Sequence, residues 1–149
     1  MRALFLIGIL MLLGSSCNKD DDPGWLYCDE CSTQDWYGNY SGDGSLYVWY
    51  NPDETSNVVV DVSIEPLYEN TWKIVVSSED NFILSFMGKE VDTGCFFDMA
   101  GTGKSIHLTL FNKEGEYKIS GSAKSYDNTG DSVILNKSVS FEVFKLVED

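Results

Sequence analysis

Cationic side chains are scarce in this 149-residue sequence. Ten Lys and Arg stand against 24 Asp and Glu, which gives a net charge of −14 at pH 7. Nucleic-acid binding needs Lys and Arg to neutralise phosphates, so the composition argues against it and against charge-driven adhesion to anionic membranes. The surplus of carboxylates suits a cationic partner, although solubility alone also explains it.

Long hydrophobic runs are lacking as well. The longest, Ala3–Leu13, has eleven residues, whereas a helix needs roughly 20 to cross the hydrocarbon layer. The run follows Met1-Arg2 and ends at Gly14-Ser15-Ser16-Cys17. A positive start, a short apolar stretch and a small-residue end are the parts of a secretory signal. We therefore expect residues 1–16 to be a signal peptide and not a membrane span.

The end of this segment, Leu13-Gly14-Ser15-Ser16-Cys17, resembles the lipobox of bacterial lipoproteins, with Gly14 where Leu is commonest. The resemblance implies that Cys17 becomes the first residue of the mature chain and carries diacylglycerol and a further fatty acid such as palmitate. Two or three acyl chains anchor a protein stably to a membrane. An ordinary signal followed by a coincidental cysteine is the alternative.

The acidic run after Cys17 resembles the short export tag with which some Gram-negative bacteria send lipoproteins to the outer face of the outer membrane. The resemblance implies a lipid-anchored protein exposed on the cell surface, whereas the alternative is a solvated acidic linker. We expect a tether over residues 17–34 and one domain over residues 35–149, a length that suits a single core. The candidate tag residues are Lys19, Asp20, Asp21 and Asp22.

Cysteines other than Cys17 number three: Cys28, Cys31 and Cys95. Disulfides persist outside the inner membrane, so we expect one structural disulfide, with its pairing open. A bridge from Cys28 or Cys31 to Cys95 would close a loop of about 60 residues or more, worth on the order of 4 kcal/mol. A thioredoxin-like role for Cys28 and Cys31 is disfavoured because nothing helical follows them. Zinc held by the three cysteines and His107 would need scattered segments to converge.

Helical periodicity is absent from residue 36 onward, where apolar side chains recur at every second position, as they do in strands. The gaps carry turn residues and none is long enough for a crossover helix. The expected fold class is all-β: an eight-stranded antiparallel up-and-down meander that closes into a small barrel, with a β-sandwich as the alternative. The eight strands are expected at residues 36–50, 58–65, 72–77, 82–86, 95–99, 106–111, 117–123 and 138–143.

Closure of the barrel requires the first and last strands to pair. We expect Tyr40–Val48 to lie against Val139–Val143, with Gly42 and Gly44 fitting tight curvature in the first strand. The alternation of the last strand slips at Phe144, which suggests a bulge there.

The first strand, with Trp36-Tyr37-Gly38-Asn39-Tyr40, and the strand count resemble lipocalin-like and calycin-like small lipoprotein domains. This resemblance implies a noncatalytic module that binds a small apolar ligand inside the barrel. The strands are shorter than in true lipocalins, and an eight-stranded barrel holds either packed side chains or one small ligand. The candidate ligand-facing residues are Tyr40, Trp72, Phe82 and Phe97.

Catalytic and metal-binding motifs are missing. His107 is the only histidine, it lies on the polar face of its strand, and no nucleophile elbow accompanies it. The Gly101–Ser105 segment has Asp98 where a phosphate-binding loop needs glycine, and a strand pattern follows it, so we interpret it as a hairpin turn. Asp127 and Asp131 lack the twelve-residue calcium-loop pattern. We expect no enzymatic activity, no cofactor and no metal, with a hydrolase as a distant alternative.

Outward-facing aromatic side chains are the most functional-looking feature. Exposed aromatic patches mark binding surfaces. The alternatives are that tether residues 25–27 cover these side chains or that this face is the true core. A rival function is therefore a protein-interaction module, such as an inhibitor of a cationic host or competitor enzyme. Ser120-Gly121 is similar to part of a motif in small-barrel lipoproteins that inhibit lysozyme, but the tyrosine that follows is misplaced for it. The outward aromatics are Tyr37, Tyr47 and Trp49 on the first strand and Phe111 on the sixth.

Overall fold

The computed structural model describes residues 24–147 apart from 52, 54, 69, 91–93, 130 and 131. The expected signal peptide, the lipidation site Cys17 and the expected tag from Lys19 to Asp22 lie outside these residues. Within the described part, no helix has the length and apolar character to cross a bilayer.

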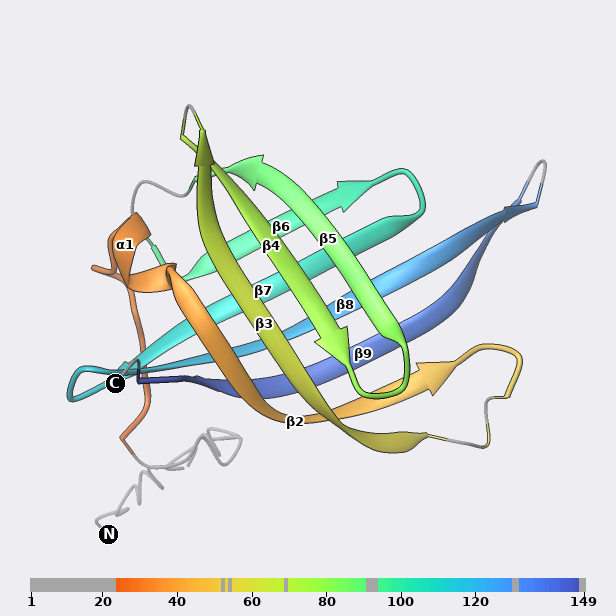
Figure 1. Cartoon of the computed structure of the whole chain (residues 1–149), viewed down its shortest axis with the longest axis horizontal. Coiled ribbons are helices and arrows are strands. Elements are labelled where there is room, and N and C mark those ends of the chain that lie inside the picture. The colour runs from red at the N-terminus through yellow and green to blue at the C-terminus, as the bar shows by residue number, and fades with distance from the viewer. Residues whose placement is uncertain are drawn as a thin grey trace, which may run out of the picture.

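Strands account for most of the described chain (Figure 1). A short strand, β1 (Leu26–Tyr27), and a single helical turn, α1 (Thr33–Trp36), come first. The longer strands that follow correspond to the strands predicted from the period-two pattern. They are β2 (Gly38–Val48), β3 (Ser56–Tyr68), β4 (Thr71–Ser78), β5 (Phe82–Lys89), β6 (Phe96–Gly101), β7 (Lys104–Lys113), β8 (Glu116–Thr129) and β9 (Ser132–Lys145).

Helix α1 corrects two expectations. A helical turn does follow the cysteine pair, and Trp36 ends that helix where the sequence pattern placed it in the first strand. The cause is a capping box: the backbone N–H of Ser32 donates to Asp35 Oδ2 at 2.7 Å, and the Ser32 side chain caps the helix in return. Such reciprocal caps satisfy N–H groups that a helix start leaves free.

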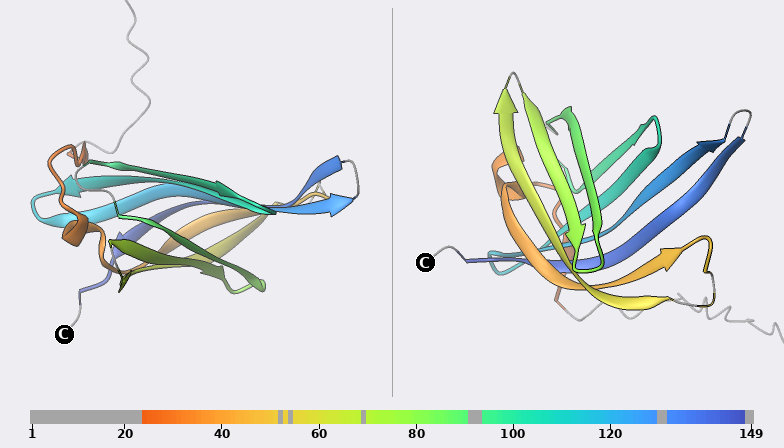
Figure 2. Two further views of the ribbon diagram at one scale, coloured as in Figure 1. Left: turned by 90° about the horizontal axis from the view of Figure 1, so that it is seen from above. Right: turned by 45° about the vertical axis from the view of Figure 1, so that its right-hand side comes forward.

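All pairings in the sheet are antiparallel, which confirms the predicted meander. Neighbouring strands follow the order β7-β8-β9-β2-β3-β4-β5, and both β6 and β1 pair with the other edge of β7. The sheet curls into a half-barrel, so that one half of the sheet lies over the other half (Figure 2). Among the described residues, backbone pairing joins every pair of neighbours around this curl except β5 and β6.

The predicted pairing of the first and last long strands is confirmed. In β2 and β9, Gly42 lies opposite Val143 and Leu46 lies opposite Val139. The register continues without a shift to Lys145, so the bulge predicted at Phe144 is wrong for the described strand. Phe144 simply faces outward and is 46% exposed.

The core occupies the concave face of the curl. Rings from three elements meet in it: Trp36 from α1 lies 5.5 Å from Trp72 in β4, which lies 5.2 Å from Phe97 in β6. Helix α1 is tied to the sheet at this end, because Tyr40 donates a hydrogen bond to the Trp36 carbonyl at 2.9 Å and Lys145 donates to the Asp35 carbonyl at 2.9 Å.

Tight curvature in β2 depends on glycine, as expected. A Cβ at Gly42 would lie 2.9 Å from Val143 Cα and would also collide with the Glu142 carbonyl. A Cβ at Gly44 would lie 2.6 Å from Val60 Cγ2. Real side chains essentially never approach so closely, so neighbouring strands pack against bare backbone at these two positions.

Candidate functional site

The predicted ligand-facing residues do point into the interior, where they pack against protein. Tyr40, Trp72, Phe82 and Phe97 are all buried. Of these four residues, only Tyr40 lines one of the main surface pockets of the described chain. Trp72, Phe82 and Phe97 line none of them. Two interior polar atoms, Trp72 Nε1 and Ser78 Oγ, are buried without a hydrogen-bond partner in the described structure.

The predicted surface aromatics do not come together. Tyr37 precedes β2 and Trp49 follows it, so the length of an eleven-residue strand separates them. Tyr37 packs edge-on against Trp72 at 6.3 Å and donates to the Glu90 carboxylate; burial and this hydrogen bond raise its pKa to about 12. Tyr47 is half-buried, and Trp49 is 48% exposed.

A different aromatic group forms on the outer face where the tether meets the sheet. Tyr27 stacks on Phe111 at 5.0 Å and lies 5.8 Å from Phe96, and Trp25 meets Phe144 edge-on at 5.8 Å. We call these five residues the aromatic patch. Only Phe111 was among the predicted outward aromatics, and Tyr27 partly covers it, as the alternative interpretation held. The other four come from segments whose proximity depends on strand register.

Lys118 joins the two parts of the aromatic patch. Its ammonium lies 5.1 Å from the ring centres of both Trp25 and Phe111, within the range of cation–π attraction. The same ammonium forms an ion pair with the Glu142 carboxylate on β9. The lysine is buried despite its charge, which is tolerated because it is paired.

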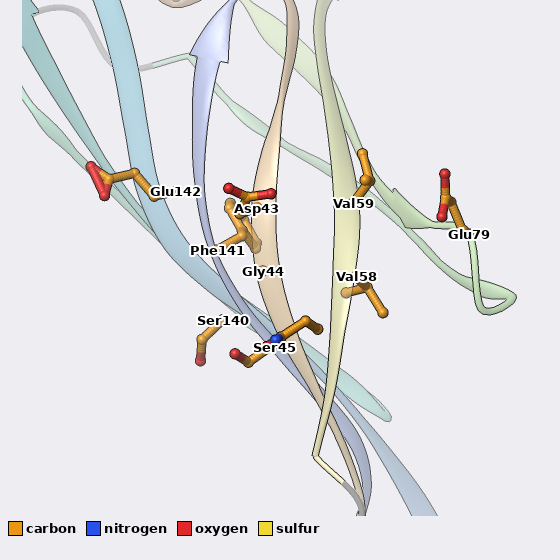
Figure 3. Close-up of a pocket in the computed structure, with 10 residues that line it drawn as sticks. Asp43, Gly44, Ser45, Val58, Val59, Glu79, Ser140, Phe141 and Glu142 are labelled. Atoms are coloured by element: carbon orange, nitrogen blue, oxygen red, sulfur yellow. The ribbon is translucent and has the colours of Figure 1, made fainter.

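An acidic groove lies beside the patch on the outer face of β9, β2 and β3 (Figure 3). It is a depression of about 700 Å³. In the register, Asp43 lies opposite Glu142 on one side and Val59 on the other, and Glu79 approaches from the turn after β4. The groove is lined by the carboxylates of Asp43, Glu79 and Glu142 together with Ser45, Asn57, Val59 and Ser140.

The charges of the groove are only partly neutralised. Glu142 has Lys118 as its partner, but Asp43 and Glu79 have no cationic side chain within 4.0 Å in the described part of the chain. Lys118 already neutralises Glu142, so the uncompensated negative charge of the groove lies on Asp43 and Glu79.

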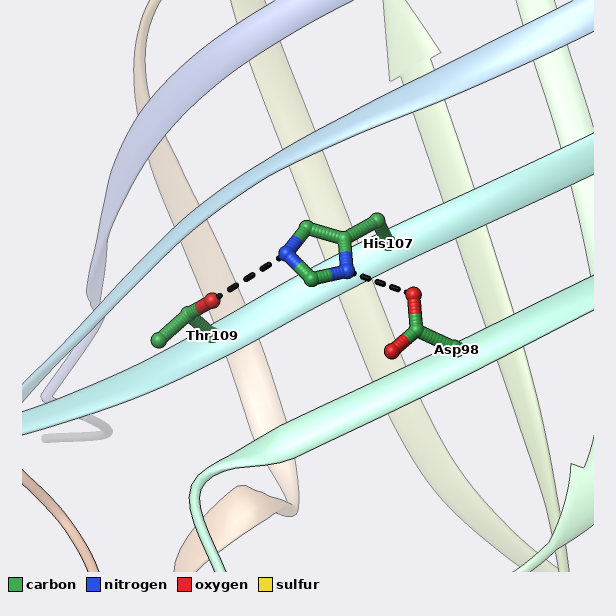
Figure 4. Close-up of polar contacts among 3 residues, drawn as sticks. All are labelled: Asp98, His107 and Thr109. Atoms are coloured by element: carbon green, nitrogen blue, oxygen red, sulfur yellow. Dashed lines mark hydrogen bonds and ion pairs between the residues drawn. The ribbon is translucent and has the colours of Figure 1, made fainter.

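His107 belongs to a small polar chain on the outer face of β6 and β7 (Figure 4). Its Nδ1 lies 2.5 Å from Asp98 Oδ1 and its Nε2 lies 3.5 Å from Thr109 Oγ1. The order hydroxyl, imidazole, carboxylate is that of a hydrolase triad, but the Thr109 contact is long. The surrounding backbone N–H groups belong to a paired sheet, which leaves no cluster of free donors to stabilise an oxyanion.

The three cysteines in the described part of the chain divide into a disulfide and a free thiol. Cys28 pairs with Cys31, so the expected loop-closing alternatives do not form, and Cys95 is free and buried. Burial and a hydrogen bond from its Sγ to Asp29 Oδ1 (3.3 Å) raise the pKa of Cys95 and keep it protonated. Backbone hydrogen bonds hold this segment to the domain instead: Cys28 donates to Leu110 at 3.1 Å. The described residues contain no group of three or more metal ligands.

Of the remaining motifs, one is the expected turn, whereas Asp127 lies in β8 opposite Ile134 and not in a turn. Gly101–Ser105 spans the hairpin between β6 and β7, with Gly103 at φ 77°. Asp127 accepts a hydrogen bond from Asn136 at 3.1 Å, and Asp131 lies outside the described residues. Comparison of the chain with protein-family models, with curated proteins and with solved structures finds no match.

Proposed function

We propose that this protein is a lipid-anchored surface lipoprotein whose half-barrel binds a cationic protein through the acidic groove, without catalysis. The observation that carries the proposal is the groove itself: two carboxylates without cationic partners, Asp43 and Glu79, face solvent across a depression on the outer face. The interior, by contrast, is filled by aromatic side chains.

The electrostatics of the whole chain support the same partner. A net charge of −14 raises the local concentration of cationic proteins and speeds their encounter. Within the groove, Val59 supplies apolar contact and Ser45 and Ser140 supply hydroxyl groups. An arginine or lysine side chain entering the groove would find carboxylates, hydroxyls and a small apolar surface together. A cationic enzyme of a host or competitor, such as a lysozyme, has suitable chemistry.

Binding of a cationic lysozyme to the purified domain, measured calorimetrically over a range of salt concentrations, tests the groove. The double variant Asp43→Asn/Glu79→Gln should weaken binding by about tenfold or more, as for paired charges at an interface. Glu114→Gln/Glu116→Gln, which removes the same charge from the exposed turn after β7 and the exposed first residue of β8, is the matched control and should change affinity by about twofold at most. Equal losses in the two variants would reduce the interaction to net charge and refute the groove.

The anchor is tested separately. Cys17→Ser should release the protein from the membrane fraction and abolish labelling by a fatty-acid analogue. Replacing Lys19, Asp20, Asp21 and Asp22 with Ala should keep the lipid but remove accessibility to external protease in intact cells. Labelling that survives Cys17→Ser would refute the lipid site, and unchanged protease access would reduce the acidic run to a linker.

A second candidate function is binding of a small apolar ligand between the layers of the half-barrel. One observation favours it: the unpaired Trp72 Nε1 would donate a hydrogen bond to an acceptor on such a ligand, since a buried donor without a partner is costly. An environment-sensitive apolar fluorophore should then bind the wild-type protein and lose affinity in Trp72→Phe. Absence of saturable binding would leave the groove as the only candidate.

A further inference from the structure

The aromatic patch is an exposed apolar surface that the acidic groove does not use. Tyr27 is 55% exposed and Phe96 is 54% exposed, although they contact each other and Phe111. Single exposed apolar side chains are ordinary, but a contiguous exposed group marks a surface that something else covers.

The position of the patch in the chain points to what covers it. Trp25 and Tyr27 belong to the segment that leads from the proposed lipid anchor into the sheet. Cys17 precedes Trp25 by eight residues, and fully extended chain spans at most about 3.5 Å per residue, so the anchor lies within roughly 28 Å of the patch. A lipid on Cys17 would hold the patch at the bilayer surface, where a tether turns a weak contact into an effectively intramolecular one.

The chemistry of the patch fits the membrane–water interface. Trp and Tyr carry an apolar ring with a polar group, and they are enriched at headgroup depth for that reason. Two ammonium groups lie beside the patch. That of Lys118 pairs with Glu142, whereas that of Lys113, 6.0 Å from the centre of the Trp25 ring, has no carboxylate within 4.0 Å in the described part of the chain. A lysine at headgroup depth keeps its charge in the polar layer while its stem lies along apolar surface. The attraction is apolar and aromatic, which suits a chain whose net charge opposes binding to anionic surfaces.

We propose that the aromatic patch docks on the surface of the bilayer that holds the lipid anchor, with Trp25 and Tyr27 at headgroup depth. This inference rests on the lipid-anchor part of the proposed function. Because β9 carries Phe144 in the patch and Glu142 in the groove, docking also fixes the groove beside the headgroups. A cationic protein would then be bound at the membrane surface.

Depth-dependent fluorescence quenching tests the docking. The full lipid-bearing chain is reconstituted in phosphatidylcholine vesicles that contain lipid labelled with a nitroxide at a shallow or a deep acyl position. The shallow label should quench part of the tryptophan emission more strongly than the deep label. The quenched part of the emission should disappear in Trp25→Phe. It should remain in Trp49→Phe, which removes the exposed indole that follows the C-terminal end of β2.

A second pair of variants separates docking from folding. Tyr27→Ser/Phe96→Ser should restore Trp25 emission in vesicles while the circular dichroism spectrum stays unchanged. Ile83→Ser, which removes a side chain of 69% exposure outside the patch, should leave quenching intact. Quenching that persists in Trp25→Phe overturns the docking, and so does a patch-dependent dimer in detergent, because a second copy would then be the occupant.

The mass of the intact protein keeps this test distinct from that of the proposed function. If Cys17 carries lipid and Trp25 is still not quenched, the docking is overturned and the anchor stands. If the chain carries no lipid, the anchor fails and the docking fails with it. Neither result bears on the affinity of the groove for a cationic protein.

Discussion

The curl of this sheet brings two pairs of strands together, β2 with β9 and β5 with β6, and these two seams are built differently. At the β2–β9 seam, strands about a hundred residues apart in the chain pair continuously from Tyr40 opposite Lys145 to Val48 opposite Lys137. At the β5–β6 seam, strands that follow each other in the chain have no backbone pairing within the described residues. Proximity in the sequence therefore does not decide which strands pair through their backbones.

Side chains bridge the β5–β6 seam where backbone does not. The Phe97 ring lies over Gly88, where a Cβ would come within 3.0 Å of it, and Lys104 donates a hydrogen bond to the Ser85 carbonyl on β5. The Lys104 ammonium also lies 5.2 Å from the centre of the Phe86 ring. Side-chain contacts, one of them from a lysine on β7, thus connect β5 to the strands across the open seam.

The β2–β9 seam should be the more sensitive of the two to loss of packing. Phe141 is buried on β9 opposite Gly44, so Phe141→Ala should cost about 3–5 kcal/mol of unfolding free energy, as for other large-to-small core changes. Ser140→Ala, one residue along and outward, should stay within about 0.5 kcal/mol. Urea denaturation of both variants measures the difference. Equal losses would mean that the strand is buried on both faces.

Backbone contact at the same seam gives the next largest effect. Gly42→Ala places a Cβ against the β9 backbone, 2.9 Å from Val143 Cα, and should cost about 1–3 kcal/mol because main chain has to move. Gly101→Ala is the matched control, since a Cβ there meets nothing within 4 Å, and it should lie within about 0.5 kcal/mol of wild type. Thermal unfolding of the two variants distinguishes them. A Gly42→Ala protein as stable as wild type would show that β2 and β9 are packed loosely enough to accept a Cβ at this position.

The strands could be predicted from the sequence because they follow from alternation, and the β2–β9 seam because closure of a meander pairs its first and last strands. One face of each strand is apolar, and that period sets the inward positions, including Tyr40, Trp72, Phe82 and Phe97. One error, at Trp36, had a local cause. Alternation appeared to continue through Trp36, but the Ser32–Asp35 capping box makes a helical turn there, a signal that the sequence did contain.

The groove and the aromatic patch could not be predicted in the same way. Asp43, Glu79 and Glu142 come from three distant segments, and only the register of β2 with β3 and β9 places them together. Phe144 broke the alternation of the last strand because its apolar side chain lies on the outer face. The structure explains this position, because Trp25 packs against Phe144 there. Alternation gives the face of each residue; the neighbours on that face depend on pairing between strands.

The β5–β6 seam should respond weakly and locally. Lys104→Met removes the hydrogen bond to the Ser85 carbonyl but keeps the apolar stem, so it should cost at most about 1 kcal/mol. Hydrogen exchange should accelerate in β5 and stay unchanged in β2 and β9. Lys124→Met on the outer face of β8 is the control and should alter neither region. Acceleration across the whole sheet would show that the seams open together.

Alkaline pH should loosen the β2–β9 seam at its α1 end, by the smallest of these effects. Tyr117 donates to Asp35 Oδ1 at 2.7 Å, and this hydrogen bond, with burial, raises the pKa of Tyr117. Burial also raises the pKa of Tyr40. A raised folded-state pKa gives stability that is complete below the unfolded value of 10.0 and is lost as pH rises above it. Burial lowers the pKa of Lys145 against the opposing effect of Asp35, so its contribution grows with pH up to its unfolded value of 10.5.

These opposing trends place the net loss above the unfolded value for Lys145, where the tyrosines with raised pKa values, Tyr117, Tyr40 and Tyr37, still respond. The thermal midpoint should therefore fall by a few degrees between about pH 10 and about pH 12. Tyr117→Phe should start from a lower midpoint and lose part of this pH dependence, because its hydrogen bond to Asp35 is already gone. Tyr126→Phe, whose hydroxyl contacts Ser105 on the outer face, should keep the full dependence. If Tyr126→Phe flattens the profile as much as Tyr117→Phe, the alkaline transition does not originate at this end of the seam.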